Sequence, residues 1–460
     1  MQGAFFWFLI PAISFVPTVT TFESLKLIVC LDIVFFDIIH PLKTIFLLFS
    51  YIIFLMYETF IRQPASVQER AVFNIWKKDK SDTGINLAFG FRVENLDIGR
   101  LENAVKKIVS RHESLRSVFF EQNGCVFRKV FAELCVDIER LESDDLRKFI
   151  RPFDLEKGPL FRFALRKDIV CLDFCHIITD GFSMAIFFSE LNAFYSGKDV
   201  TYLPKSLPAE NLCEIKENTD FWASQFKNPF QRLSIPSDKK ASATNFSAYG
   251  GDGSSLVHGV GRLLTKKARA ACRELSVTPF ILYFSAFIIL LCRESSLKDV
   301  VTSTNFSCRN SRNLRSFGLF ATTPPVRFFV DEDLTALDFI KKVNSYVREA
   351  LNHQSFDSEK LLEICGLADL RDFSRTIFTF EHEKMADIRL DGKKCDYVPI
   401  PSKHSACDLT FCLFPFKDES KILAIFRADL FSRMRIRHLT RHYVEIIRKL
   451  LDMDRKISEI

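Results

Sequence analysis

The sequence contains no C-x-x-C pair, and its 13 cysteines follow no repeating spacing. Closely paired cysteines are typical of zinc sites, and an even, regularly spaced set is typical of a disulfide framework. The odd count and the irregular spacing therefore argue against both kinds of site. Free thiols indicate a reducing compartment, so we expect the main part of the chain to lie in the cytosol.

The chain also lacks a strong charge imbalance. Its formal net charge is +6 over 460 residues, and its lysines and arginines are scattered. Nucleic-acid-binding proteins concentrate basic residues on one face, so we expect no nucleic-acid partner. Hydrophobic residues make up 48% and charged residues 26%, which is typical of a globular chain. A chain of this length is expected to form two or three domains.

No basic residue stands at the very N-terminus, so the sequence does not predict a cleavable signal peptide. Residues 44–56 (TIFLLFSYIIFLM) are uncharged, and residues 42–60 approach the length of a membrane span. Arg62 and further basic residues follow, which by the positive-inside rule keeps the rest of the chain in the cytosol. We therefore predict that residues 1–61 form a hydrophobic membrane anchor. The alternative is a spurious N-terminal extension.

From residue 62 onward the pattern predicts a mixed α/β protein. Asp97 is placed to cap a helix whose apolar residues recur at helical spacing. In the first half we predict strands at 85–93, 126–131, 161–165 and 169–175, and helices at 101–112 and 182–194. In the second half we predict strands at 300–305, 326–330, 376–380, 409–414 and 422–426, and helices at 278–291, 334–352 and 434–451. Loop-rich residues between these halves indicate two lobes, 62–235 and 236–460.

Residues 173–181 (DFCHIITDG) combine three groups that can carry chemistry. His176 stands at a strand end, Asp180 follows four residues later, and Gly181 stands where the backbone turns into a helix. A neutral imidazole accepts protons near pH 7 because its unperturbed pKa lies there. On its own, such a histidine is more often a hydrogen-bonded core residue.

Other blocks along the chain give this segment a context. They are residues 65–70 (ASVQER), 111–116 (RHESLR), 152–160 (PFDLEKGPL), 318–327 (GLFATTPPVR), 352–361 (NHQSFDSEKL) and 457–460 (ISEI). Together with the histidine segment, and in this order, they resemble the condensation domain of nonribosomal peptide synthetases. That domain is a member of the chloramphenicol-acetyltransferase-like superfamily.

The resemblance implies a fold and a reaction. The fold is two chloramphenicol-acetyltransferase-like lobes, each a helix-covered mixed sheet, arranged as a V-shaped pseudodimer around a central tunnel. Two phosphopantetheine arms enter the tunnel, and the amine of one acyl group attacks the thioester of the other. The expected partners are an acyl or peptidyl carrier protein acting in trans and its acyl thioester, because no adenylation or carrier domain is recognisable. No bound cofactor and no metal are expected.

The resemblance also assigns roles to residues. His176 would accept the proton of the attacking amine or orient that amine. Asp180 would be structural, either as a buried ion-pair partner of Arg309 or as a helix cap. Gly181 would let a pantetheine arm approach the backbone; the alternative is a turn that needs a positive φ.

Two positions depart from the family pattern. Cys175 stands where the family has a first histidine, and neighbouring residues of a strand point to opposite faces. We therefore expect Cys175 to be a small buried residue and not the partner of His176 in a nucleophilic pair. Thr322 stands where the family has an asparagine. We predict that Thr322 and Ser183 contact substrate.

Three functions follow from these observations. The first is a condensation-type acyltransferase that forms an amide between carrier-bound acyl groups. The second keeps His176 as the base but uses a free alcohol or amine as the acceptor. The third is a binding or scaffold protein that keeps the fold without turnover.

Overall fold

The computed structural model describes residues 60–202, 210–239, 251–381, 388–400 and 404–460. The predicted anchor at residues 1–61 lies outside these ranges except for its last two residues, so it stays a prediction. Phe60–Ile460 forms one compact unit. Within the described ranges no single helix is long and apolar enough to cross a membrane. Helices α8 (Arg262–Glu274) and α9 (Pro279–Ser295) have the length and apolar composition of a span only when taken together, and the chain bends by 112° between them.

The N-terminal lobe is built around a five-stranded sheet with the strand order β14-β2-β7-β6-β5. The strands are β2 (Asn86–Arg92), β5 (Ile138–Arg140), β6 (Phe161–Arg166), β7 (Ile169–Cys175) and β14 (Asp396–Pro399). Helices α5 (Ile98–Arg111) and α6 (Gly181–Tyr195) pack together over one face of this sheet. Between them and the sheet lies a core rich in phenylalanine, because each ring removes a large apolar area from water.

A smaller sheet and a helix complete this lobe. The sheet has the order β1-β4-β3, with β1 (Phe60–Pro64), β3 (Ser117–Gln122) and β4 (Cys125–Phe131). Helix α4 (Val67–Lys78) begins at a capping box, in which Ser66 and Glu69 satisfy each other's backbone N–H groups. A two-stranded ribbon of β12 (Arg389–Leu390) and β13 (Lys393–Lys394) packs against α6.

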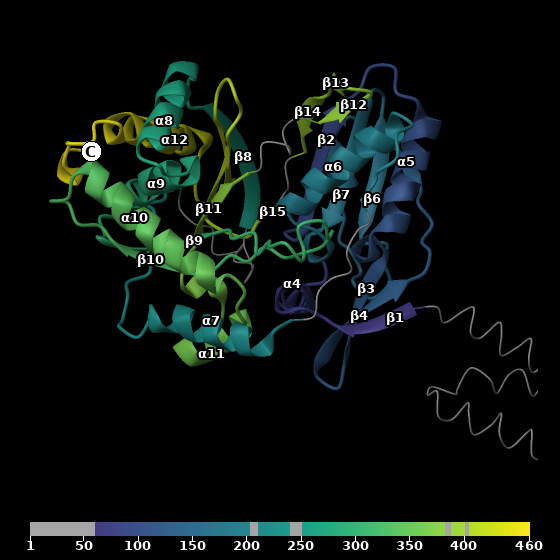
Figure 1. Ribbon diagram of the computed structural model, residues 1–460, viewed down its shortest axis with the longest axis horizontal. Helices are drawn as coiled ribbons and strands as arrows, with labels where there is room; N and C mark the ends of the chain where they lie inside the picture. The colour runs from purple at the N-terminus through teal and green to yellow at the C-terminus, as the bar shows by residue number, and fades with distance from the viewer. Residues whose placement is uncertain (1–59, 203–209, 240–250, 382–387, 401–403) are drawn as a thin grey trace, which may run out of the picture. The chain divides into compact units, whose positions relative to one another are not determined.

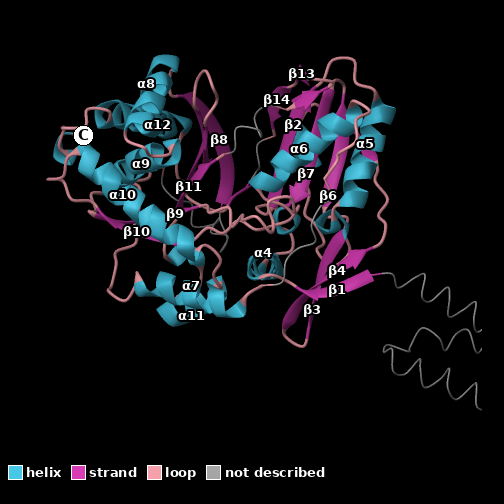
Figure 2. Cartoon of the chain, viewed as in Figure 1, coloured by secondary structure: helices cyan, strands magenta, loops and turns pink. Residues whose placement is uncertain are grey.

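The C-terminal lobe is built around a seven-stranded sheet with the order β10-β9-β11-β16-β17-β8-β15. The strands are β8 (Gly251–Gly259), β9 (Asp299–Thr304), β10 (Pro325–Phe329), β11 (Thr376–Phe380), β15 (His404–Ser405), β16 (Leu409–Phe414) and β17 (Lys421–Arg427). Helices α8, α9, α10 (Ala336–Ala350) and α12 (Arg433–Leu450) cover one face of it, as Figure 2 shows. Helices α7 (Leu212–Ser224) and α11 (Ser358–Cys365) pack against each other.

Strand alternation in the C-terminal sheet separates a core face from a cavity face. Along β16, Leu409, Phe411 and Leu413 are fully buried beneath the helices. The residues between them point the other way and line a cavity, and they are Thr410, Cys412 and Phe414. Because side chains of a strand alternate between its two faces, one sheet supplies both the lobe's core and a wall of the cavity.

The structure confirms most of the predicted elements. The strand predicted at 169–175 coincides with β7, and Asp97 caps α5 by accepting a hydrogen bond from the N–H of Arg100. Helices α4, α7, α8 and α11 were not predicted. In α8 a signal was present, because Leu264, Ala268 and Cys272 recur every four residues and are buried.

The two halves of the sequence are not fully separate in the structure. Strand β14 belongs to the second half, yet it pairs antiparallel with β2 of the first. Trp222, from the first half, is buried in the core of the C-terminal lobe. The lobe limits 62–235 and 236–460 stay a prediction.

Candidate active site

His176 lies immediately after β7, where the chain leaves the sheet in a short 3₁₀ turn. Its backbone N–H donates to the carbonyl of Ile85 at 2.8 Å, and its ring Nδ1 lies 2.9 Å from the carbonyl oxygen of Thr179. A carbonyl only accepts hydrogen bonds, so Nδ1 must carry the hydrogen. In the neutral ring, Nε2 is then the proton acceptor, and the partly exposed ring lines the cavity.

Asp180 combines the two roles that the sequence left open. It is the N-cap of α6, with Oδ1 accepting from the N–H of Ser183 at 2.8 Å. It also forms an ion pair with Arg309, whose Nη2 lies 2.8 Å from Oδ1 and 3.0 Å from Oδ2. The N–H of Phe320 donates to Oδ2 at 3.0 Å. Asp180 therefore joins the N-terminus of α6 to the loop that follows β9 through an ion pair and hydrogen bonds.

Cys175 is fully buried, at 0% exposure, in the core of the N-terminal lobe. Burial raises the pKa of its thiol to about 12, although a hydrogen bond from the backbone of Ile177 opposes the shift. A thiol with this pKa is protonated at neutral pH and is a poor nucleophile. Within the described ranges, Cys175 is not among the residues that line the cavity that His176 faces.

Ser183 and Thr322, which we predicted to contact substrate, both use their hydroxyls within the protein. Ser183 is fully buried, and its hydroxyl donates to the carbonyl of Gly318 and accepts from that residue's N–H and from Arg309. Thr322 is 6% exposed and donates to the carbonyl of Gln354 at 2.7 Å. Both hydroxyls are used inside the protein, because buried polar groups need partners. Their contact with substrate stays a prediction.

Gly181 is the first residue of α6 and lines the cavity, but its backbone is helical. The positive-φ turn considered from the sequence is therefore wrong. The remaining interpretation, a close approach of substrate to the backbone, stays a prediction.

A cavity of about 1150 Å³ lies between the two sheets. From the N-terminal lobe it is lined by the start of β2, by His176 and by the start of α6. From the C-terminal lobe it is lined by β8, β11, β16, β17 and one side of α8. The polar side chains in its wall from the C-terminal lobe include Ser254, Ser255, Asn305, Ser307, Thr323, Thr379, Glu381, Thr410 and Ser420. This volume can hold an extended small molecule or the end of a tethered arm.

The sequence reasoning missed Glu381. This residue follows β11, and its side chain lines the cavity that His176 also faces. Ile377, Thr379 and Phe380 line the cavity as well, and the alternation of β11 places Ile377, Thr379 and Glu381 on the same side of the strand. That alternation was a usable signal. What lies opposite Glu381 depends on the other lobe and could not be read from the sequence. No group of three or more metal-ligating side chains occurs in the described ranges.

Comparisons with known proteins agree on one family. The model of the family described as "Condensation domain" matches residues 64–459. Bacitracin synthase 3 of Bacillus licheniformis is 26% identical over 425 residues, which are 86% of this chain and 6% of that protein. Surfactin synthase subunit 2 of Bacillus subtilis (strain 168) is 24% identical over 408 residues, 84% of this chain and 11% of that protein. The chain thus spans a small part of these curated relatives.

Solved structures share the fold. The condensation domain from Monacolin K polyketide synthase MokA superposes with a TM-score of 0.73 at 16% identity, covering 86% of this chain and 99% of that one. The X-domain from teicoplanin biosynthesis gives a TM-score of 0.69 at 20% identity, with 86% and 97% covered. At such identities the likeness establishes the fold alone.

Proposed function

Because the chain belongs to the condensation-domain family, we propose that it is an acyltransferase that forms an amide between acyl groups presented as phosphopantetheine thioesters. One observation carries the proposal: the Nε2 of His176 is left as a proton acceptor at a cavity whose walls come from both lobes. The relatives are named as synthases of bacitracin and surfactin, which supports a role in the synthesis of peptide-like products.

In the proposed reaction the amine nitrogen of the acceptor attacks the carbonyl carbon of the donor thioester. Nε2 of His176 removes a proton from that nitrogen as the new C–N bond forms. The C–S bond of the tetrahedral intermediate then breaks, and the leaving sulfur takes a proton from His176. Holding both reacting groups in one cavity supplies further rate, because it converts an encounter in solution into a reaction between positioned groups.

The proposed partner is an acyl or peptidyl carrier protein that acts in trans. A phosphopantetheine arm is a long, thin substrate, and the cavity of about 1150 Å³ is large enough for its end and an acyl group. The arm belongs to the partner and is a substrate. No cofactor of this chain is needed for the transfer.

The experiment is to compare the wild-type chain with His176→Ala in amide formation between an acyl-carrier thioester and an aminoacyl-carrier thioester, followed by mass spectrometry. We expect a loss of about 10²-fold or more in the variant, because a general base contributes about 10²–10⁴-fold. His438→Ala is the matched control, since His438 is exposed on α12. Equal rates for the wild type and H176A would refute the proposed role of His176.

The same assay distinguishes the other two functions. Replacing the aminoacyl carrier by a free amine or a free alcohol tests for an acceptor that needs no carrier. A wild-type chain that binds the carriers but transfers no acyl group to any of these acceptors would be a scaffold.

A further inference from the structure

Glu381 is held at the cavity wall by the end of strand β11. Its backbone N–H donates to the carbonyl of Leu413 at 2.8 Å, which continues the pairing with β16. The hydroxyl of Thr379 donates to Oε1 of Glu381 at 2.8 Å. These two bonds fix the carboxyl group in the C-terminal wall of the cavity, while His176 stands in the N-terminal wall.

The carboxyl group of Glu381 has few charges around it. Burial raises its pKa, and the hydrogen bond from Thr379 and the charge of His176 oppose that rise. Two neutral groups also lie within its electrostatic reach, Tyr397 of β14 and Cys412 of β16. Within the described ranges, His176 is the cationic group whose charge acts on Glu381. The two walls of the cavity therefore carry two titratable groups, Glu381 and His176, that act on each other.

The other charged groups of the cavity wall have different positions or partners. Asp180 is engaged by Arg309. Arg269 of α8 donates to the carbonyls of Pro415 and Phe416, and Arg273 is exposed on the same helix. Within the described ranges, the carboxyl group of Glu381 accepts its hydrogen bond from a neutral hydroxyl, that of Thr379. This carboxyl group lies at the cavity that His176 also lines.

We propose that Glu381 is a second catalytic residue, which accepts a proton from the ammonium form of the acceptor and leaves His176 to accept the proton released during attack. The proposal rests on the proposed function and specifies the acceptor as an amine that enters in its protonated form. An α-amine with a pKa of about 8 is mostly an ammonium at neutral pH and has no lone pair for attack.

The protons balance over four steps. The ammonium transfers one proton to the carboxylate of Glu381 and becomes a neutral amine. As that amine forms the C–N bond, its nitrogen loses a second proton to Nε2 of His176. The C–S bond breaks, and the thiolate takes the proton from His176 to leave as a thiol. Glu381 releases its proton to water, so each cycle yields one amide, one thiol and one proton.

An alcohol acceptor would not need Glu381. It reaches the site neutral and loses a single proton, which His176 alone can accept. Glu381 thus links this site to amines, and the pH dependence of the two acceptor classes should differ.

The test uses the full chain with acetyl-N-acetylcysteamine as the donor and two acceptors of equal size, glycinamide and its alcohol analogue glycolamide. At pH 6.5 about one α-amine in thirty is uncharged, so Glu381→Gln should lower kcat/KM for glycinamide on the order of tenfold. At pH 9 the variant should match the wild type. With glycolamide the two should agree at every pH. An equal loss at both pH values, or with both acceptors, would overturn the proposal.

Two controls separate this result from other failures. Glu445→Gln changes an exposed glutamate of α12 that pairs with Arg448, and it should leave every ratio unchanged. His176→Ala should lower transfer to both acceptors by about 10²-fold or more. Equal transfer rates for H176A and the wild type would overturn the proposed function itself. If only E381Q showed no pH-dependent fall in kcat/KM, the role of Glu381 alone would be overturned.

A second measurement needs no turnover. The carboxyl band of Glu381 can be followed by infrared difference spectroscopy between the wild type and E381Q as the pH is varied. It should titrate above the range of an ordinary glutamate, and His176→Ala should move that titration further upward. An ordinary titration that does not respond to His176→Ala would contradict the proposal.

Discussion

At the scale of single residues, hydrogen bonds decide which atoms are left for chemistry. The carbonyl of Thr179 occupies Nδ1 of His176 and leaves Nε2 at the cavity. The hydroxyls of Ser183 and Thr322 likewise donate hydrogen bonds to backbone carbonyls of the protein. The sequence indicates which side chains have suitable chemistry. It does not indicate which of their atoms the fold already uses, and the two hydroxyls predicted to contact substrate both have partners within the protein.

Glu190 shows how a buried cluster links stability to pH. Its side chain is 1% exposed and bonds Nε2 of His112 at 2.9 Å and the hydroxyl of Tyr202 at 2.6 Å. Burial alone would raise the pKa of Glu190, but the hydrogen bond and charge of His112, with Tyr202 and Arg111, lower it overall. A lowered folded-state pKa means that the carboxylate stabilises the protein above its unfolded pKa, and that this contribution is lost as the pH falls.

We therefore predict two effects of Glu190→Gln. At pH 7 the free energy of unfolding should fall by about 1–3 kcal/mol, because a buried charged hydrogen-bond partner is removed. Below about pH 4.5 the unfolding free energy of the variant should decline less steeply than that of the wild type. Urea unfolding across this pH range measures both effects, and Glu142→Gln, at an exposed position, is the control. Parallel pH profiles would contradict the linkage.

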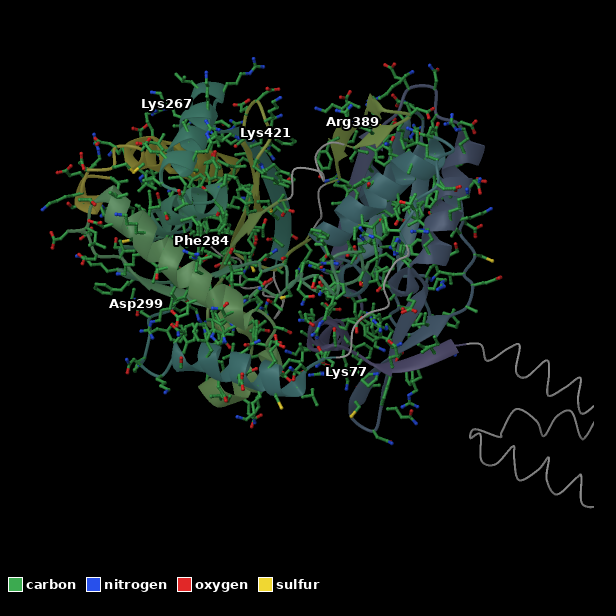
Figure 3. The ribbon with its side chains drawn as sticks, in the orientation of Figure 1. Lys77, Lys267, Phe284, Asp299, Arg389 and Lys421 are labelled. Atoms are coloured by element: carbon green, nitrogen blue, oxygen red, sulfur yellow. The ribbon has the colours of Figure 1, made fainter. Side chains whose placement is uncertain are left out.

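At the scale of elements, helix α9 carries the core of the C-terminal lobe. Its residues from Ile281 to Cys292 are all buried, and Phe284 packs against Phe328 and Phe378. Figure 3 places Phe284 among the helices of this lobe, while Lys267 and Lys421 lie nearer its upper end in this view. An apolar helix of this kind can be predicted from its composition, and the sequence did predict it at 278–291. Its burial on every side depends on α10 and α12, which are distant in sequence.

Phe284→Ala should destabilise this lobe strongly. Removing a fully buried phenylalanine costs about 3–5 kcal/mol, because it loses burial and leaves a cavity. Guanidinium unfolding measures the change. Phe329→Ala is the matched control, since Phe329 is 60% exposed on β10, and it should stay within about 0.5 kcal/mol of the wild type. Similar losses in both variants would contradict the assignment of the core.

At the scale of the whole described unit, polar contacts join the two lobes. Arg309 follows β9 of the C-terminal sheet and pairs with Asp180 at the start of α6. On helix α4, Gln68 donates to the hydroxyl of Ser355 and Arg70 pairs with Asp357. Apart from Arg309, these residues belong to the blocks that carry the resemblance to the family, and they form contacts between one lobe and the other.

Asp180→Asn tests the ion pair between Asp180 and Arg309, the most buried of these contacts between the lobes. The side chains of Arg309 and Asp180 are 3% and 2% exposed, and breaking a buried pair costs about 3–5 kcal/mol because one charge stays without compensation. The asparagine keeps one oxygen for the helix cap, so the loss reports the ion pair together with the backbone hydrogen bonds that Oδ2 accepts from Phe320 and Ala321. Asp144→Asn removes an exposed partner of Arg166 and should cost less than about 1 kcal/mol. Thermal unfolding measures both, and equal shifts would refute the role of the pair.

The pairing of β14 with β2 has a consequence for any attempt to dissect the chain. Residues 396–399 supply the outermost strand of a sheet whose other strands come from residues 86–175. A fragment cut between the halves would keep the pairing of β2 with β7 but would leave the other edge of β2, with the sequence NLAFGFR, unpaired. Such an open edge is a template for other chains, and it favours aggregation. Strand β14 therefore protects the edge of β2, and a soluble first half would have to be expressed together with β14.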